Sequence, residues 1–224
     1  MATYTNKNIG VVLAGSGWQD GSEIHEAVLT LLYLDKASAK IIMMAPDLKQ
    51  MNVVHHLTNE TVHAESRNTL VEAARIARGD VKDIKDISSN ELDALIIPGG
   101  FGVAKNLCDF ATKGENLSVN PLLEKMILEM HEEKKPLGFM CISPVIAAKV
   151  LGKFYPKLTI GNDEGTADII EKLGAQHINC PVDEIVVDKK NLVVTTPAYM
   201  LGPSIAYIAK GIEKLVNKVL EFTE

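Results

Sequence analysis

Short apolar runs alternate with segments of helical periodicity along this chain, and that alternation limits the folds it can adopt. The runs at residues 9–14, 94–98 and 137–140 are almost wholly apolar. A strand buried on both faces has this composition, whereas a strand with one solvated face alternates apolar and polar residues. Buried strands separated by helices are typical of a parallel sheet. The sequence therefore predicts an α/β fold, with a mostly parallel central sheet and helices on both of its faces.

The remaining elements follow from periodicity and from turn residues. No stretch rich in Pro, Gly or Ser divides the chain, so residues 1–224 are predicted to form a single domain. The segment 20–22 is predicted to cap the first helix. Strands are predicted at 40–45 and 157–160, hairpins at 53–63 and 184–195, and helices at 24–32, 68–77, 121–133, 166–173 and 204–222.

Cys141 stands where a buried strand gives way to a helix. The apolar run 137–140 ends at this cysteine, Pro144 follows three residues later, and helical spacing continues to Leu151. This order predicts a strand–Cys–helix nucleophile elbow, in which the side chain faces the N-terminus of the next helix and its thiolate is favoured. A buried cysteine that merely fills the end of a strand gives the same pattern, so both interpretations stay open.

A second pattern, Pro98-Gly99-Gly100, follows another buried strand. Glycines at this place allow backbone N–H groups to point into a site, because no Cβ stands in the way. Together with the N–H of Ile142, the N–H of Gly100 can bind a developing oxyanion. A simple tight turn also explains the glycines, and only their combination with Cys141 favours a site.

Two carboxylates, Glu23 and Glu26, lie three residues apart near the start of the first helix. Glu23 fits a favourable charge at a helix N-terminus, whereas Glu26 lies beside the apolar stripe and is harder to explain as a surface residue. A carboxyl next to a cysteine can serve as a proton carrier. The glycines at 15–21 are spaced G-x-G-x-x-x-G, which departs from the dinucleotide fingerprint, and no cofactor is predicted.

Composition excludes several classes of function. The formal net charge of -6 disfavours nucleic acid, and no apolar run is long enough for a membrane span. Three cysteines in 224 residues do not form a disulfide framework, and they indicate a reducing compartment, with the cytoplasm as the expected location. The six histidines show no metal-ligand spacing, so no metal site is predicted.

Taken together, the Pro-Gly-Gly turn, the Cys141-x-x-Pro144 elbow and a glutamate on the first helix resemble the class I glutamine-amidotransferase-like superfamily. Within it, segments 21–32, 92–107, 135–144, 180–188 and 193–201 are most similar to the isoprenoid biosynthesis glyoxalases, also called enhancing lycopene biosynthesis proteins. The resemblance implies a flavodoxin-like sandwich, a homodimer, a nucleophile at Cys141, a glutamate at Glu26 (with Glu23 as the alternative), and oxyanion amides at Gly100 and Ile142.

Departures from the superfamily narrow the chemistry. Amidotransferases complete their triad with a His-x-Glu that is absent after His177, and the protease-like branch has a histidine where this chain has Ile142. Aldehyde-handling members place a histidine in the region that corresponds to 158–163, which contains none. Glu26 is therefore the expected proton carrier, helped by a pocket histidine such as His25 or His56, and slow chemistry is predicted.

The resulting hypothesis is a glyoxalase-type lyase that needs neither metal nor glutathione. Cys141 adds to the aldehyde of glyoxal or a similar dicarbonyl, Glu26 moves a proton through an enediol, and the thioester hydrolyses to a 2-hydroxy acid such as glycolate. The alternative is a non-enzymatic redox sensor or binding protein that uses the same cysteine, because an exposed low-pKa thiolate oxidises selectively.

Overall fold

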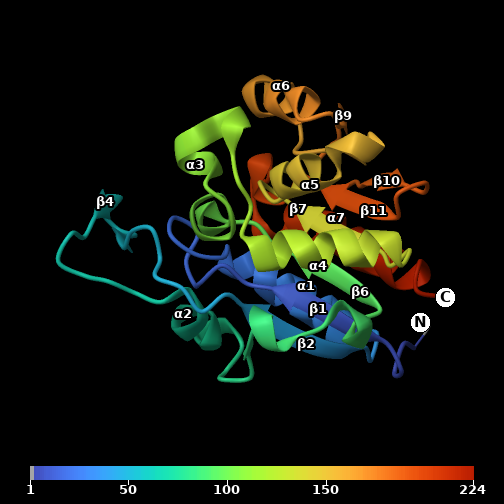
Figure 1. Cartoon of the computed structure of the whole chain (residues 1–224), viewed down its shortest axis with the longest axis horizontal. Helices are drawn as coiled ribbons and strands as arrows, with labels where there is room; N and C mark the ends of the chain where they lie inside the picture. Colours follow the sequence, from blue (N-terminus) through green and yellow to red (C-terminus); the bar gives the residue numbers. More distant parts are fainter. Residues whose placement is uncertain (1–2) are drawn as a thin grey trace.

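The computed structural model describes residues 3–224 and has a seven-stranded sheet in the order β10-β11-β7-β6-β1-β2-β5 (Figure 1). Every neighbouring pair is parallel except β10 with β11, so the predicted mostly parallel sheet is confirmed. Its strands are β1 (Asn8–Val12), β2 (Lys40–Ala45), β5 (Lys82–Asp83), β6 (Ala94–Ile97), β7 (Leu137–Met140), β10 (Val186–Asp188) and β11 (Val193–Thr196).

Helices cover both faces of this sheet, as predicted. One face carries α1 (Ile24–Lys36), α2 (Thr69–Ile76) and α7 (Ile205–Glu221). The other carries α4 (Pro121–Glu132) and α5 (Pro144–Leu151), with α6 (Glu164–Lys172) packed on the outer side of α5. Figure 1 shows α4 and α5 lying over the strands, and the short α3 (Phe110–Lys113) beside them.

The two helical layers explain why the central strands are apolar throughout. Along β6, Ala94 and Ile96 belong to the hydrophobic core beneath α1 and α7, whereas Leu95 and Ile97 belong to the core beneath α4 and α5. Successive side chains point to opposite faces of a strand, and here both faces are buried. Each of these four side chains is 0% exposed.

Outside the main sheet, the structure confirms a predicted hairpin and corrects the length of a predicted strand. The hairpin at 53–63 is present as the antiparallel pair β3 (Val54–His55) and β4 (Glu60–Thr61), although His56 lies in the turn and not on the strand. The strand predicted at 157–160 is only β8 (Lys157–Leu158), and it pairs with β9 (Gln176–His177) in a separate two-stranded sheet.

The start of α1 also differs from the prediction, because the cap is Glu23 and not the segment 20–22. A Glu23 carboxylate oxygen accepts a hydrogen bond from the N–H of Glu26 at 2.7 Å. The predicted capping residues hold the preceding loop instead. Ser22 Oγ accepts from the N–H of Ala14 at 2.8 Å, and Asp20 Oδ2 accepts from the N–H of Val54 at 2.7 Å.

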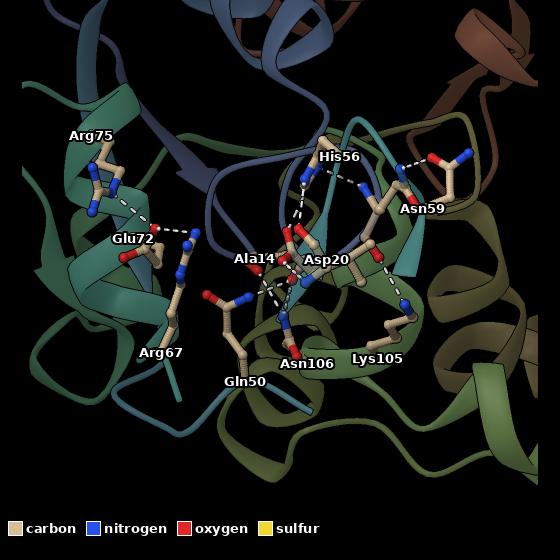
Figure 2. Close-up of polar contacts among 12 residues, drawn as sticks. Ala14, Asp20, Gln50, His56, Asn59, Arg67, Glu72, Arg75, Lys105 and Asn106 are labelled. Atoms are coloured by element: carbon tan, nitrogen blue, oxygen red, sulfur yellow. Dashed lines mark hydrogen bonds and ion pairs between the residues drawn. The ribbon is translucent and has the colours of Figure 1, made fainter. Parts of the chain in front are cut away.

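That loop, residues 14–23, is held by a buried polar network (Figure 2). Asn106 lies in a π-helical turn, Val103–Leu107, that the sequence did not predict, and its Nδ2 donates to the carbonyls of Ala14 and Asp20, each at 2.9 Å. Its Oδ1 accepts from the N–H of Met51 at 3.0 Å. The network therefore ties the end of β1 to a segment that follows β6, and so fixes the loop that leads into α1.

We predict that Asn106→Leu lowers the free energy of unfolding by about 1 to 3 kcal/mol, because the buried Ala14 carbonyl loses the hydrogen bond from Asn106 Nδ2 and the Met51 N–H loses its acceptor. Urea unfolding followed by circular dichroism measures this difference. The same change at the exposed Asn116 is the control and is expected to have little effect. Equal free energies of unfolding for the two variants would contradict a stabilising contribution from this network.

Candidate functional site

Cys141 is held at the carboxyl end of β7 in a backbone conformation that residues other than glycine rarely adopt. Its φ of 60° lies in the left-handed region, and α5 begins three residues later. Ser143 secures the turn, since its Oγ accepts from the N–H of Met140 at 2.8 Å and donates to the carbonyl of Ile97 at 2.8 Å. The predicted elbow is thus present, and its strained conformation is kept by bonds to two neighbouring strands.

Glu26, and not Glu23, faces this cysteine. Its side chain is fully buried on α1 and forms a hydrogen bond with the Cys141 thiol. One carboxylate oxygen, Oε2, accepts from the N–H of Gly99 at 2.8 Å, and the other accepts from the N–H of Tyr199 at 3.1 Å. The capping role of Glu23 explains the choice, because its carboxylate is held by the N–H of Glu26, while the Glu26 side chain lies in the first turn of α1 and is buried.

The glycines after β6 are required by this contact. A Cβ on Gly99 would lie 2.4 Å from the Cβ of Cys141 and 2.6 Å from Glu26 Oε2. A Cβ on Gly100, whose φ is 101°, would lie 2.3 Å from the backbone nitrogen of Glu23. Both positions admit only glycine, so the Pro98-Gly99-Gly100 turn is needed for close approach as well as for its free N–H groups.

Backbone amides also surround the sulfur. The N–H groups of Gly100 and Ile142 form hydrogen bonds with Cys141 Sγ, and both oppose the rise in the pKa of the thiol. These are the two amides that the sequence singled out as oxyanion donors. Their position shows that they can stabilise negative charge at the sulfur or on an oxygen bound next to it.

Burial changes the acid–base properties of the pair. Loss of solvent raises the pKa of Glu26 to about 7, and the charge of Glu23 adds to this rise, while the N–H of Tyr199 opposes it. Burial and the Glu26 charge together raise the pKa of the Cys141 thiol well above its usual value. The prediction of a favoured thiolate is therefore wrong for the resting site, because desolvation outweighs the helix N-terminus. A reaction at this sulfur therefore requires a group that accepts the thiol proton.

A pocket of about 410 Å³ leads to Cys141, which is itself only 8% exposed. The sequence predicted Cys141, Gly100, Ile142 and Glu23 here, but it gave no reason to expect the aromatic walls. The one feature of the sequence that could have indicated an aromatic wall is Trp18, the single tryptophan, which lies within the glycine-rich loop. The lining consists of Trp18, Glu23, Gly100, Phe101, Phe110, Cys141, Ile142, Asp163, Thr166, Tyr199 and Met200.

Tyr199 is a further site residue that sequence reasoning missed. It follows Ala198, whose φ of 45° is unusual for a residue with a Cβ, and this bend aims the Tyr199 N–H at Glu26. Its phenol forms a hydrogen bond of 2.7 Å with Nδ1 of His25. His25 is not among the lining residues, and it contacts the pocket through Tyr199 and through Glu23, whose carboxylate oxygen lies 4.0 Å from His25 Nδ1.

The other candidate residues lie away from the pocket. His56 is 3.8 Å from a carboxylate oxygen of Asp20, in the network that holds the 14–23 loop (Figure 2). Cys108 and Cys180 are buried free thiols, and burial raises the pKa of Cys108 to about 12 and that of Cys180 to about 11. Neither of these two cysteines lines the pocket.

Within residues 3–224, no three side chains of His, Cys, Asp or Glu are grouped so that they could hold a metal ion. None of the helices in that part of the chain combines the length and the apolar composition needed to cross a membrane.

Comparison with known proteins identifies relatives across almost the whole chain, although no protein-family model matches it. The human glutamine amidotransferase-like class 1 domain-containing protein 3, mitochondrial, is 45% identical, and the match covers 96% of this chain and 83% of the human protein. The rat ES1 protein homolog, mitochondrial, is 44% identical, with 96% and 84% covered.

Solved structures agree with these relatives. An Ehrlichia chaffeensis isoprenoid biosynthesis protein with an amidotransferase-like domain superposes with a TM-score of 0.90 at 38% identity, covering 97% of this chain and 100% of that one. Drosophila melanogaster DJ-1beta shares the fold, with a TM-score of 0.57 at 17% identity, covering 99% and 96%. The predicted flavodoxin-like arrangement and the predicted resemblance are both confirmed. The chain belongs to the class I glutamine-amidotransferase-like family that includes the ES1 proteins.

Proposed function

We propose that this protein is a glyoxalase that converts glyoxal-type dicarbonyls to 2-hydroxy acids without a cofactor. The observation that carries the proposal is the hydrogen bond between the buried Glu26 carboxyl and the Cys141 thiol at the base of an open pocket. A nucleophile in contact with a base whose pKa is about 7 is poised for reaction near neutral pH. Family members at low identity share the fold alone, so the activity is inferred from this site.

The first step forms a bond between Cys141 Sγ and one aldehyde carbon of glyoxal. The thiol proton passes to Glu26, and the carbonyl oxygen becomes an oxyanion that the amides of Gly100 and Ile142 can stabilise. Protonation of this oxygen by the Glu26 carboxyl gives a hemithioacetal and returns Glu26 to its basic form. Atoms and charge balance without an oxidant, since the thiol has only added across the C=O bond.

The second step moves a hydrogen between the two carbons. Glu26 removes the proton from the carbon bonded to sulfur, giving an enediol, and the neighbouring carbon is then protonated. The product is a thioester of glycolic acid on Cys141. Water hydrolyses it, releasing glycolate and restoring the thiol, so glyoxal and one water give one glycolate. Because one carboxyl serves every proton transfer and no histidine lines the pocket, we expect slow turnover.

The geometry supports this enzyme over a redox sensor. Selective oxidation is typical of an exposed thiol with a low pKa. Cys141 is 8% exposed, and burial raises the pKa of its thiol. A sensor would be consumed once for each thiol, whereas the proposed cycle regenerates it.

We further propose that the protein works in the cytoplasm. Its three cysteines are all free and buried, which fits a reducing compartment. The names of the human and rat relatives place those two proteins in mitochondria. Cell fractionation with an antibody against this chain decides between the two locations.

The first test replaces the nucleophile. We predict that Cys141→Ser abolishes conversion of glyoxal to glycolate, because a serine hydroxyl next to one carboxylate is a far weaker nucleophile than a thiol. Chromatographic measurement of glycolate, in a buffer without amines, follows the reaction. Cys180→Ser is the matched control, since Cys180 is also buried and free but does not line the pocket. Consumption of only one aldehyde per thiol, with no glycolate, would refute the proposed cycle.

The second test concerns the base. We predict that kcat of the wild-type protein rises from about pH 6 to about pH 8, with a midpoint near the Glu26 pKa of about 7. The sign follows because the carboxylate accepts the proton and is lost as the pH falls below its raised pKa. Since carboxyl and thiol are coupled, the midpoint belongs to the pair.

Glu26→Gln removes that base and is expected to lower kcat by about 100-fold or more and to abolish the rise near neutral pH. Glu132→Gln, on the exposed side of α4, makes the same chemical change away from the pocket and serves as the control. An unchanged pH profile in the Glu26 variant would show that another group carries the proton.

A further inference from the structure

The walls of the pocket indicate which aldehydes it accepts. We propose that it selects uncharged aldehydes with an apolar, preferably aromatic, substituent and excludes anionic ones, so that an aryl α-oxoaldehyde is a better substrate than glyoxal. The part that concerns turnover rests on the proposed glyoxalase activity of Cys141. The part that concerns binding rests on the pocket alone.

The size of the pocket is the first observation. About 410 Å³ lies within the range of roughly 300–1,000 Å³ that is typical of sites for small organic ligands. Glyoxal has only two carbons, so it leaves most of this space unfilled when its carbonyl reaches Cys141. A substrate that fills the pocket carries a further group directed away from the sulfur, toward the open side.

The aromatic walls are the second observation. Trp18 and Phe101 are 47% and 51% exposed, and their ring centroids lie 5.9 Å apart. Within residues 3–224 about half of each side chain stays exposed, although large aromatic side chains normally bury most of their surface. Phe110 and Met200 complete an apolar wall around the same space. A flat, apolar substituent would remove these surfaces from water.

Charge is the third observation. The lining contains two carboxylates, Glu23 and Asp163, and it contains no Lys, Arg or His. A hydrogen bond from Thr166 lowers the pKa of Asp163, so this exposed side chain is ionised at neutral pH. An anionic aldehyde that enters meets negative charge at the wall and Glu26 at the base, and repulsion in a partly desolvated site is strong.

The nearest cation does not offset this charge. Lys105 Nζ lies 5.8 Å from the centre of the Phe101 ring but donates to the carbonyl of Gln19 at 2.8 Å (Figure 2). It is not among the residues that line the pocket. Its charge is therefore engaged behind the aromatic wall, and an anion in the pocket has no cationic partner there.

Turnover provides the first test. The wild-type protein is expected to convert phenylglyoxal to mandelate with a kcat/KM at least about 10-fold above that for glyoxal, after division by the rates of both aldehydes with 2-mercaptoethanol. Phe101→Ala is expected to lower kcat/KM for phenylglyoxal more than kcat/KM for glyoxal, and so to remove most of this preference. Tyr207→Ala, at a side chain 49% exposed on α7, is the matched control. Equal preference in both variants would overturn the role of the aromatic wall.

Alkylation of Cys141 provides a second test that needs no turnover. Iodoacetamide and iodoacetate differ in charge and attack the same sulfur, so the ratio of their rates cancels the reactivity of the thiol. The rates are followed by mass spectrometry of the peptide that contains Cys141. The ratio of the iodoacetamide rate to the iodoacetate rate is expected to be at least about 10-fold larger for Cys141 than for 2-mercaptoethanol. Asp163→Asn keeps an N-cap side chain for α6 and is expected to narrow the difference several-fold. Asp80→Asn, an exposed residue outside the pocket, removes the same charge as a control.

The two tests separate the two proposals. If Cys141 reacts more slowly with iodoacetate as expected but no mandelate or glycolate is formed, the proposed glyoxalase activity is refuted and the selectivity of the pocket is supported. Turnover of glyoxal as efficient as that of phenylglyoxal, together with equal alkylation by both reagents, would support the enzyme and refute the selectivity.

Discussion

The contact between the Glu26 carboxyl and the Cys141 thiol is the constraint on which the rest of the site depends. Both groups are buried, and burial disfavours the charged form of each. The fold offsets this cost with N–H groups from Gly99 and Tyr199 on the carboxyl, and from Gly100 and Ile142 on the sulfur. These donors come from three different segments of the chain, so the contact exists only when the strand ends are assembled.

Backbone packing is what makes that assembly possible. The loop before α1 and the loop after β6 touch through glycines, since a Cβ on Gly102 would lie 2.4 Å from the Cα of Gly21. Hydrogen bonds from the N–H of Glu23 to the Gly99 carbonyl and from the N–H of Gly102 to the Gly21 carbonyl, each 2.9 Å, join the same loops. A side chain at these places would separate the loops and withdraw Glu26 from the sulfur. The glycine-rich segments therefore determine a distance between two functional groups.

Local patterns predicted the features that depend on neighbouring residues. The apolar run before Cys141 indicated its strand, and the following proline and apolar stripe indicated the helix, because both signals are read within one segment. The choice between Glu23 and Glu26 required the cap of α1, and one turn of shift exchanges the two. The raised pKa of the thiol and the walls of the pocket could not be predicted from local patterns. Burial, and the position of Trp18 and Phe110 on one pocket, depend on contacts between distant segments.

The charge of the site connects its reactivity with its selectivity. With the Glu26 pKa near 7 and the thiol pKa raised, the pair holds between one and two protons at neutral pH, and it becomes negative as Glu26 ionises. A cation in the lining would stabilise the thiolate and speed attack, but it would also attract anions and hold an acidic product. A lining of aromatic rings and carboxylates does the reverse. In the proposed reaction it leaves the activation of sulfur to one carboxylate and a few amides, and it repels the carboxylate of the 2-hydroxy acid once hydrolysis has released it.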